Sequence, residues 1–108
     1  MEEVNMQNTD MTILSIDLIA SHPKVRNGSP VVAETGIRVM DIAAATIFHQ
    51  RTPDELAVDY NLSLAQVYAA LSYYYAHKAE IDEEIRQQDE AFVRLKEESL
   101  ANRRSLLP

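Results

Sequence analysis

The sequence predicts a mainly helical fold: a helix-turn-helix preceded by a short β-hairpin and followed by an extended C-terminal helix. Three observations lead to this fold class. Two capped helical segments with a three-residue connection occupy residues 52–78. β-Branched residues flank a turn containing glycine at residues 30–39. A segment without glycine and without a helix stop signal follows residue 78, which favours a long helix.

The two helices of the central pair begin at matching signals. Thr52 is a good N-cap residue, with a proline at the first helical position and Glu55 at the third, and Ser63 repeats the pattern with Gln66 at the third position. Asn61, in the connection, suits the left-handed conformation that ends a helix. These signals are typical of a helix-turn-helix, and any crossed helix pair in a small bundle is the alternative, because short helix–helix connections are common.

With 108 residues, the chain is long enough for one domain with a modest core and too short for two. Residues 1–12 are polar and predict a loose N-terminus. Residues 13–78 predict the helix-turn-helix domain with its N-terminal β elements, and residues 79–108 predict an acidic helical extension.

The β elements are expected between residues 13 and 39. The apolar residues at 13–19 fit either a short strand or one turn of helix. The predicted hairpin joins residues 30–32 to residues 37–39, with Gly36 supplying a positive φ near the turn. Helices are then expected near residues 40–49, 53–59 and 64–78.

The third of these helices carries three consecutive tyrosines, which cannot all face the core because successive helical residues point about 100° apart. Tyr73 is expected to emerge at the side of the helix. The residues expected to face the core recur at helical spacing: Leu64, Val67, Leu71, Tyr74 and Tyr75.

Several classes of function are excluded by what the sequence lacks. The chain has no cysteine, so disulfides, thiol catalysis and cysteine-based zinc sites are excluded. Its three histidines lack a second group at ligand spacing, and no nucleophile elbow, phosphate-binding glycine loop or paired-acid motif is found. We therefore expect no enzyme activity, metal or cofactor. No apolar run reaches the roughly 20 residues of a membrane span, and a cytoplasmic location is expected.

The charge distribution limits DNA binding. The net charge is −7, although residues 22–78 contain five acids and five bases and are neutral. If the motif binds DNA, polar residues of the second helix would contact bases and basic residues outside it would contact phosphates. The candidates are Gln66 and Ser72 for the bases, and Lys24, Arg26, Arg38 and Arg51 for the phosphates.

Residues 79–108 contain eight acids and five bases, and too few apolar residues to form a core alone. This helix therefore needs a surface to pack on: its own domain, a symmetric copy or another protein. A homodimer is expected, and the alternative is an acidic arm that binds a basic partner. The candidate contact residues are Ile81, Ile85, Phe92 and Leu95.

The motifs together resemble the domain of unknown function 433 (DUF433) family over roughly residues 19–85. The matching positions are Pro23, Gly28, Pro30, Thr35-Gly36-Ile37-Arg38-Val39, Thr52-Pro53-Asp54-Glu55, Leu62-Ser63 and Ala69-Ala70-Leu71-Ser72-Tyr73. The chain departs from the pattern where Gln50 replaces the glycine that ends the first helix, and in the order of Thr35 and Gly36.

This resemblance implies a homeodomain-like helix-turn-helix and an antitoxin-like protein that binds a toxin of the PIN nuclease type, with promoter DNA as a further expected partner. The alternative is a protein-interaction or dimerisation module that keeps the helix-turn-helix scaffold without binding DNA.

Overall fold

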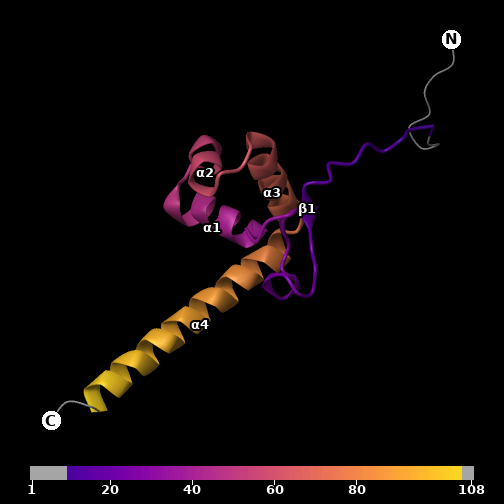
Figure 1. Cartoon of the computed structure of the whole chain (residues 1–108). Helices are drawn as coiled ribbons and strands as arrows, with labels where there is room; N and C mark the ends of the chain where they lie inside the picture. The colour runs from indigo at the N-terminus through magenta and orange to yellow at the C-terminus, as the bar shows by residue number, and fades with distance from the viewer. Residues whose placement is uncertain (1–9, 106–108) are drawn as a thin grey trace.

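The computed structural model describes residues 10–105, and the predicted mainly helical fold is confirmed. Helices α1, α2 and α3 pack as a small bundle with the strands beside it, and α4 extends away from the bundle (Figure 1). Of the predicted loose segment, residues 1–9 lie outside the described part, and residues 10–12 have no regular structure. The elements in chain order are β1 (Ile19–Ala20), η1 (Arg26–Gly28), β2 (Val31–Val32), α1 (Val39–His49), α2 (Pro53–Tyr60), α3 (Leu64–Ala76) and α4 (Lys78–Ser105).

The two strands pair antiparallel, with Ile19 opposite Val32. The predicted hairpin between residues 30–32 and 37–39 is reduced to one bridge between Val31 and Arg38, so the strand partner of β2 is the earlier segment. The physical reason is that α1 begins at Val39, and a residue cannot continue a strand while its backbone is helical.

The turn between β2 and α1 has its left-handed residue at Glu34, with φ 63°. The expectation that Gly36 supplies this conformation is wrong. Thr35 holds the turn instead: its N–H and its hydroxyl both donate to the Val32 carbonyl, at 3.0 and 2.7 Å. The Thr35 hydroxyl oxygen also accepts from the N–H of Ile37 at 3.1 Å. These bonds hold the turn in place, with its left-handed residue, Glu34, immediately before Thr35.

The helix-turn-helix begins as its caps predict. The Thr52 hydroxyl accepts from the Glu55 N–H at 3.2 Å, and the Glu55 carboxylate accepts from the Thr52 N–H at 3.0 Å. Ser63 and Gln66 make the same reciprocal pair, at 3.1 and 2.8 Å. Between them Asn61 is left-handed, with φ 54°. Each element is therefore fixed at its start by bonds that span three residues.

The predicted continuous helix from residue 64 is interrupted at His77, where φ is −127° and ψ is 38°. The His77 ring stacks on the Tyr73 ring at a centroid distance of 4.0 Å, and its Nδ1 lies 3.1 Å from the Tyr73 carbonyl oxygen. The interruption redirects the chain, so that the first turns of α4 pack against α1 and α3.

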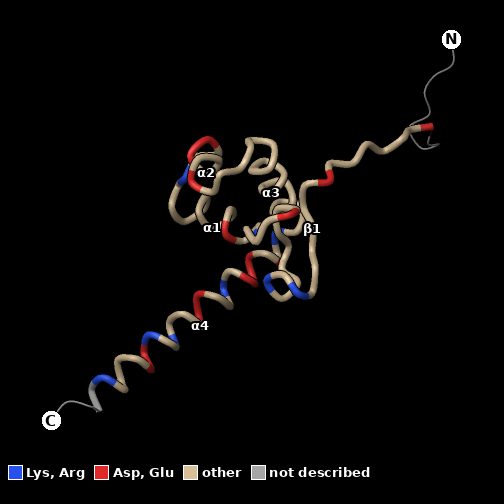
Figure 2. The backbone as a smooth tube through the Cα atoms, viewed as in Figure 1, with Lys and Arg blue, Asp and Glu red and all other residues tan. Residues whose placement is uncertain are grey.

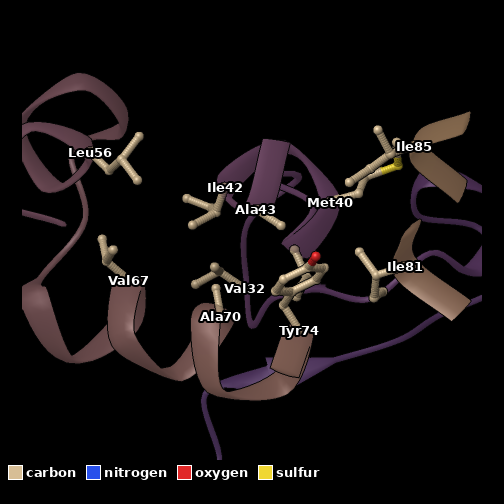
Figure 3. Packing of buried hydrophobic residues seen from close by; sticks show 11 residues of the cluster. Val32, Met40, Ile42, Ala43, Leu56, Val67, Ala70, Tyr74, Ile81 and Ile85 are labelled. Atoms are coloured by element: carbon tan, nitrogen blue, oxygen red, sulfur yellow. The ribbon is translucent and has the colours of Figure 1, made fainter. Parts of the chain in front are cut away.

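The core lies between α1, α3, β2 and the start of α4. Figure 3 shows Ile81 and Ile85 of α4 in the same cluster as Met40 and Tyr74. The first two turns of α4 are therefore part of the core, and the uncovered length of this helix begins after Ile85. The buried cluster comprises Val32, Val39, Met40, Ile42, Ala43, Leu56, Val67, Ala70, Tyr74, Ile81 and Ile85.

The buried side of α3 is rotated from the predicted one. Val67, Ala70 and Tyr74 are buried, whereas Leu64 and Tyr75 are 45% and 64% exposed, and the expectation that these two face the core is wrong. Tyr73, expected to emerge at the side, packs partly against the cluster. The reason is Ala70: its small side chain is fully buried and permits close packing on this face.

Candidate functional site

The surface of α3 that a DNA-binding helix-turn-helix would present carries little chemistry for DNA. Residues 64–76 contain no lysine or arginine. Ser72 is exposed and available, but the Gln66 side-chain oxygen is held in the cap of α3 by the Ser63 N–H. A bidentate contact of Gln66 with adenine would require that cap to open.

Two of the four basic side chains predicted to contact phosphates are already paired with carboxylates. Arg38 donates two bonds to Asp41, at 3.0 and 2.9 Å. Arg51 donates to Glu55 at 2.7 Å and also to Asp59, and the hydrogen bond with Asp59 is the main cause that raises the pKa of the guanidinium. A phosphate would have to displace these carboxylates, which reduces the gain from counterion release.

The other two predicted phosphate contacts, Lys24 and Arg26, are exposed. Both belong to the segment between β1 and β2, and Figure 2 shows this segment beside the start of α4 and away from the α2–α3 connection. Arg26 shares a hollow with Glu84 of α4. The structure therefore does not bring the four candidate bases together around α3.

A different surface combines exposed apolar side chains with a concave shape. The end of α1, the end of α3 and one side of α4 enclose a hollow of about 470 Å³. Phe48 of α1 and Tyr75 of α3 line it and are 61% and 64% exposed. We name this hollow the junction groove. Its lining residues are Ile47, Phe48, Tyr74, Tyr75, Lys78, Asp82, Ile85, Arg86 and Asp89.

The floor of the junction groove is fixed by a polar network. The Tyr74 hydroxyl donates to one oxygen of Asp82 at 2.6 Å, and the Lys78 ammonium donates to the other at 2.8 Å. The bonds from Lys78 and Tyr74 hold the pKa of the Asp82 carboxyl below its ordinary value. Burial, followed by the bond to Asp82, raises the pKa of Tyr74. This network of hydrogen bonds joins α3 to α4 at the junction groove.

The four predicted partner contacts on α4 divide into two pairs. Ile81 and Ile85 are 1% and 6% exposed in the chain's own core, so they are not available to a partner and are removed from the predicted surface. Phe92 and Leu95 are both 66% exposed on the part of α4 that extends beyond the core.

Sequence reasoning missed Phe48 and Tyr75 as surface residues. Phe48 had no assigned role, and Tyr75 was placed in the core. Helical spacing gave no signal that separates the two cases, because a stripe of Val67, Ala70 and Tyr74 has the same spacing as the predicted stripe but leaves Tyr75 outside.

Within residues 10–105, no group of three or more His, Cys, Asp or Glu side chains is placed to hold a metal ion. None of the helices in this part of the chain combines the length and the apolar character needed to cross a membrane.

Comparison with known families decides the relationship. Residues 19–74 match the family described as a protein of unknown function, DUF433. The chain belongs to the DUF433 family. The matched segment runs from β1 almost to the end of α3, so α4 of this DUF433 protein lies outside it. No curated protein matches the chain, and neither does any solved structure.

Proposed function

We propose that this DUF433 protein is a non-enzymatic, protein-binding antitoxin that acts in the cytoplasm by holding a nuclease-like toxin of the PIN type. The class of partner comes from the family resemblance. The surface comes from the junction groove, where two large side chains, Phe48 and Tyr75, remain 61% and 64% exposed around a concave space. Exposed apolar surface of this kind, rimmed by charge, is typical of protein-binding sites.

The groove fits a partner segment with an apolar anchor. Aromatic side chains supply most of the energy of such contacts when water is excluded from them. Along its α4 wall the groove alternates Lys78, Asp82, Arg86 and Asp89, so the rim offers both signs of charge to position a partner. Residues 79–108 as a whole carry more acids than bases, which suits a nuclease that must attract phosphates.

The experiment is a pull-down of a PIN-type toxin by this chain. Phe48→Ala combined with Tyr75→Ala is expected to weaken capture by at least about tenfold, because each change removes an aromatic anchor. The matched control is Tyr68→Ala, which truncates a tyrosine of α3 that is 57% exposed and outside the groove. Failure of the wild-type chain to capture the toxin would overturn the proposal, and full capture by the double variant would remove the groove from it.

DNA binding is the second candidate, and the capped helix-turn-helix with Ser72 exposed on α3 is the observation that favours it. The pairing of Arg38 and Arg51 with carboxylates opposes it. In gel-shift assays with DNA from the promoter of its own gene, we expect the protein alone to give no shift at about 150 mM salt. The reason is that few of its basic side chains are available to contact phosphates. A specific shift under those conditions would give DNA binding priority.

A further inference from the structure

Along one face of α4, the same residue spacing runs from the part that is buried in the core to the part that is exposed to solvent. Apolar and uncharged polar residues follow at alternating intervals of four and three, which is the heptad spacing of a coiled-coil seam. The seam residues are Ile81, Ile85, Gln88, Phe92, Leu95 and Ser99. The first two are buried by the chain's own domain, whereas Phe92 and Leu95 are each 66% exposed. The uncovered part of the seam therefore presents its apolar side chains to solvent, at the spacing that a second helix would match.

The edge of this seam carries opposite charges that do not meet within the chain. Asp89 and Lys96 are seven residues apart, which places them on the same side of α4 but about 10.5 Å apart along its axis. Among the residues that the structure describes, neither takes part in an ion pair. Each is therefore available to a charge of opposite sign on a neighbouring helix.

We propose that the uncovered seam of α4 pairs antiparallel with the same seam of a second copy, with Phe92 of each chain against Leu95 of the other. In this register Asp89 faces Lys96 of the second copy within about two residues, or roughly 3 Å along the axis. Two-fold symmetry repeats each contact, so the Phe92–Leu95 layer and the Asp89–Lys96 ion pair each form twice.

A parallel pair fits the chain less well for two reasons. It would place Glu84 beside Asp89 of the second copy, which is a like-charge contact, and Glu84 is already bonded to Ser29 at 2.7 Å. It would also bring both domains to the same end of the helix pair, where each domain already covers Ile81 and Ile85. The antiparallel arrangement places the two domains at opposite ends.

This pairing does not depend on the proposed toxin binding. The two surfaces share Ile85 and Asp89, but the exposed apolar contacts of the pairing are Phe92 and Leu95, whereas those of the junction groove are Phe48 and Tyr75. Failure of either interaction would leave the other testable.

The orientation can be tested by cysteine cross-linking, because the full chain contains no cysteine. Phe92→Cys and Leu95→Cys chains that carry tags of different mass are mixed and oxidised. We expect the disulfide between the two different variants to exceed same-site disulfides several-fold, because facing positions are close enough for a disulfide. Same-site disulfides in excess would show a parallel pair, and neither product above the level of an exposed Glu97→Cys control would show no pair. Both outcomes overturn the proposal.

Charge reversal tests the register in the full-length chain. Sedimentation equilibrium of the wild type is expected to give twice the 12.2 kDa chain mass at concentrations on the order of 100 μM. Lys96→Asp should weaken this association about tenfold, since it replaces two attractive pairs by two repulsive ones. Adding Asp89→Lys to that variant should restore it, while Glu97→Lys, on the outer side, should leave it unchanged. A wild type that stays at the single-chain mass, or a double variant that is not restored, contradicts the proposed register.

Discussion

Tyr74 joins the core of the domain to the polar surface of α4. Its ring is only 1% exposed, and its hydroxyl donates to Asp82 at 2.6 Å. Burial first, and then the neighbouring carboxylate, raise its pKa above the ordinary value of 10.0, because both disfavour the tyrosinate.

A pH dependence follows from this raised pKa. The folded state holds the Tyr74 proton more tightly than the unfolded chain does, so this stabilisation is complete below pH 10 and is lost as the pH rises through the folded-state pKa. In urea unfolding between about pH 9 and pH 11, we expect Tyr74→Phe to lose less stability with rising pH than the wild type. Tyr75→Phe, which changes a neighbour that is 64% exposed, should keep the wild-type dependence. Equal slopes for wild type and Tyr74→Phe would show that this hydroxyl does not control alkaline stability.

At the scale of the elements, the helix ends are set by local hydrogen bonds and by two left-handed residues. Asn61 ends α2 with φ 54°, and Gln50 ends α1 with φ 53°. Asparagine adopts this conformation readily, whereas a glutamine in it carries a steric cost of about 1–2 kcal/mol. The end of α1 therefore combines an unfavourable residue conformation with local backbone bonds, because the N–H groups of Gln50 and Arg51 both donate to the Ala45 carbonyl.

Gln50→Gly is accordingly expected to raise the free energy of unfolding by up to about 1 kcal/mol, since relief of the steric cost exceeds the extra entropy of a glycine in the unfolded chain. Asn61→Gly, at the matching position of α2, should be nearly neutral. Urea unfolding of both variants measures the difference. A lower midpoint for Gln50→Gly would mean that the glutamine side chain makes a stabilising contact worth more than its strain.

At the scale of the whole molecule, α4 divides into a part that packs in the core and a part that extends beyond it. Its first two turns close the core through Ile81 and Ile85, and the remaining twenty residues to Ser105 extend for about 30 Å from the domain. Figure 1 shows this uncovered helix directed away from the bundle. The proposed interaction surface of α4 is thereby separated from the residues that hold the fold together.

Two truncations should separate these roles. A chain that ends after Gln87 keeps every buried residue of the core and should retain the wild-type urea midpoint and the circular dichroism expected for its shorter helix. A chain that ends after Lys78 loses Ile81 and Ile85, each worth about 1.5–3 kcal/mol of burial, which is a large part of the stability of a small domain. We expect it to be largely unfolded. A folded chain ending after Lys78 would show that α4 does not complete the core.

The caps, the order of the first three helices and the helix-turn-helix were determined by the sequence alone. The reason is distance along the chain: the bonds of Thr52 with Glu55, and of Ser63 with Gln66, join residues three apart and need no other element. The family relationship is carried by these same motifs and is therefore also a property of the sequence alone.

The tertiary structure decided which side of each element is covered. Helical spacing admits stripes that end at either Tyr74 or Tyr75, and only the close packing around Ala70 selects the first. The same holds for Ile81 and Ile85, which the bend at His77 brings into the core, and for Arg51, whose bond to Asp59 spans the α2 segment. These choices depend on contacts between residues distant in sequence, whose energies a single segment does not contain, and they moved the candidate site from the face of α3 to the junction groove.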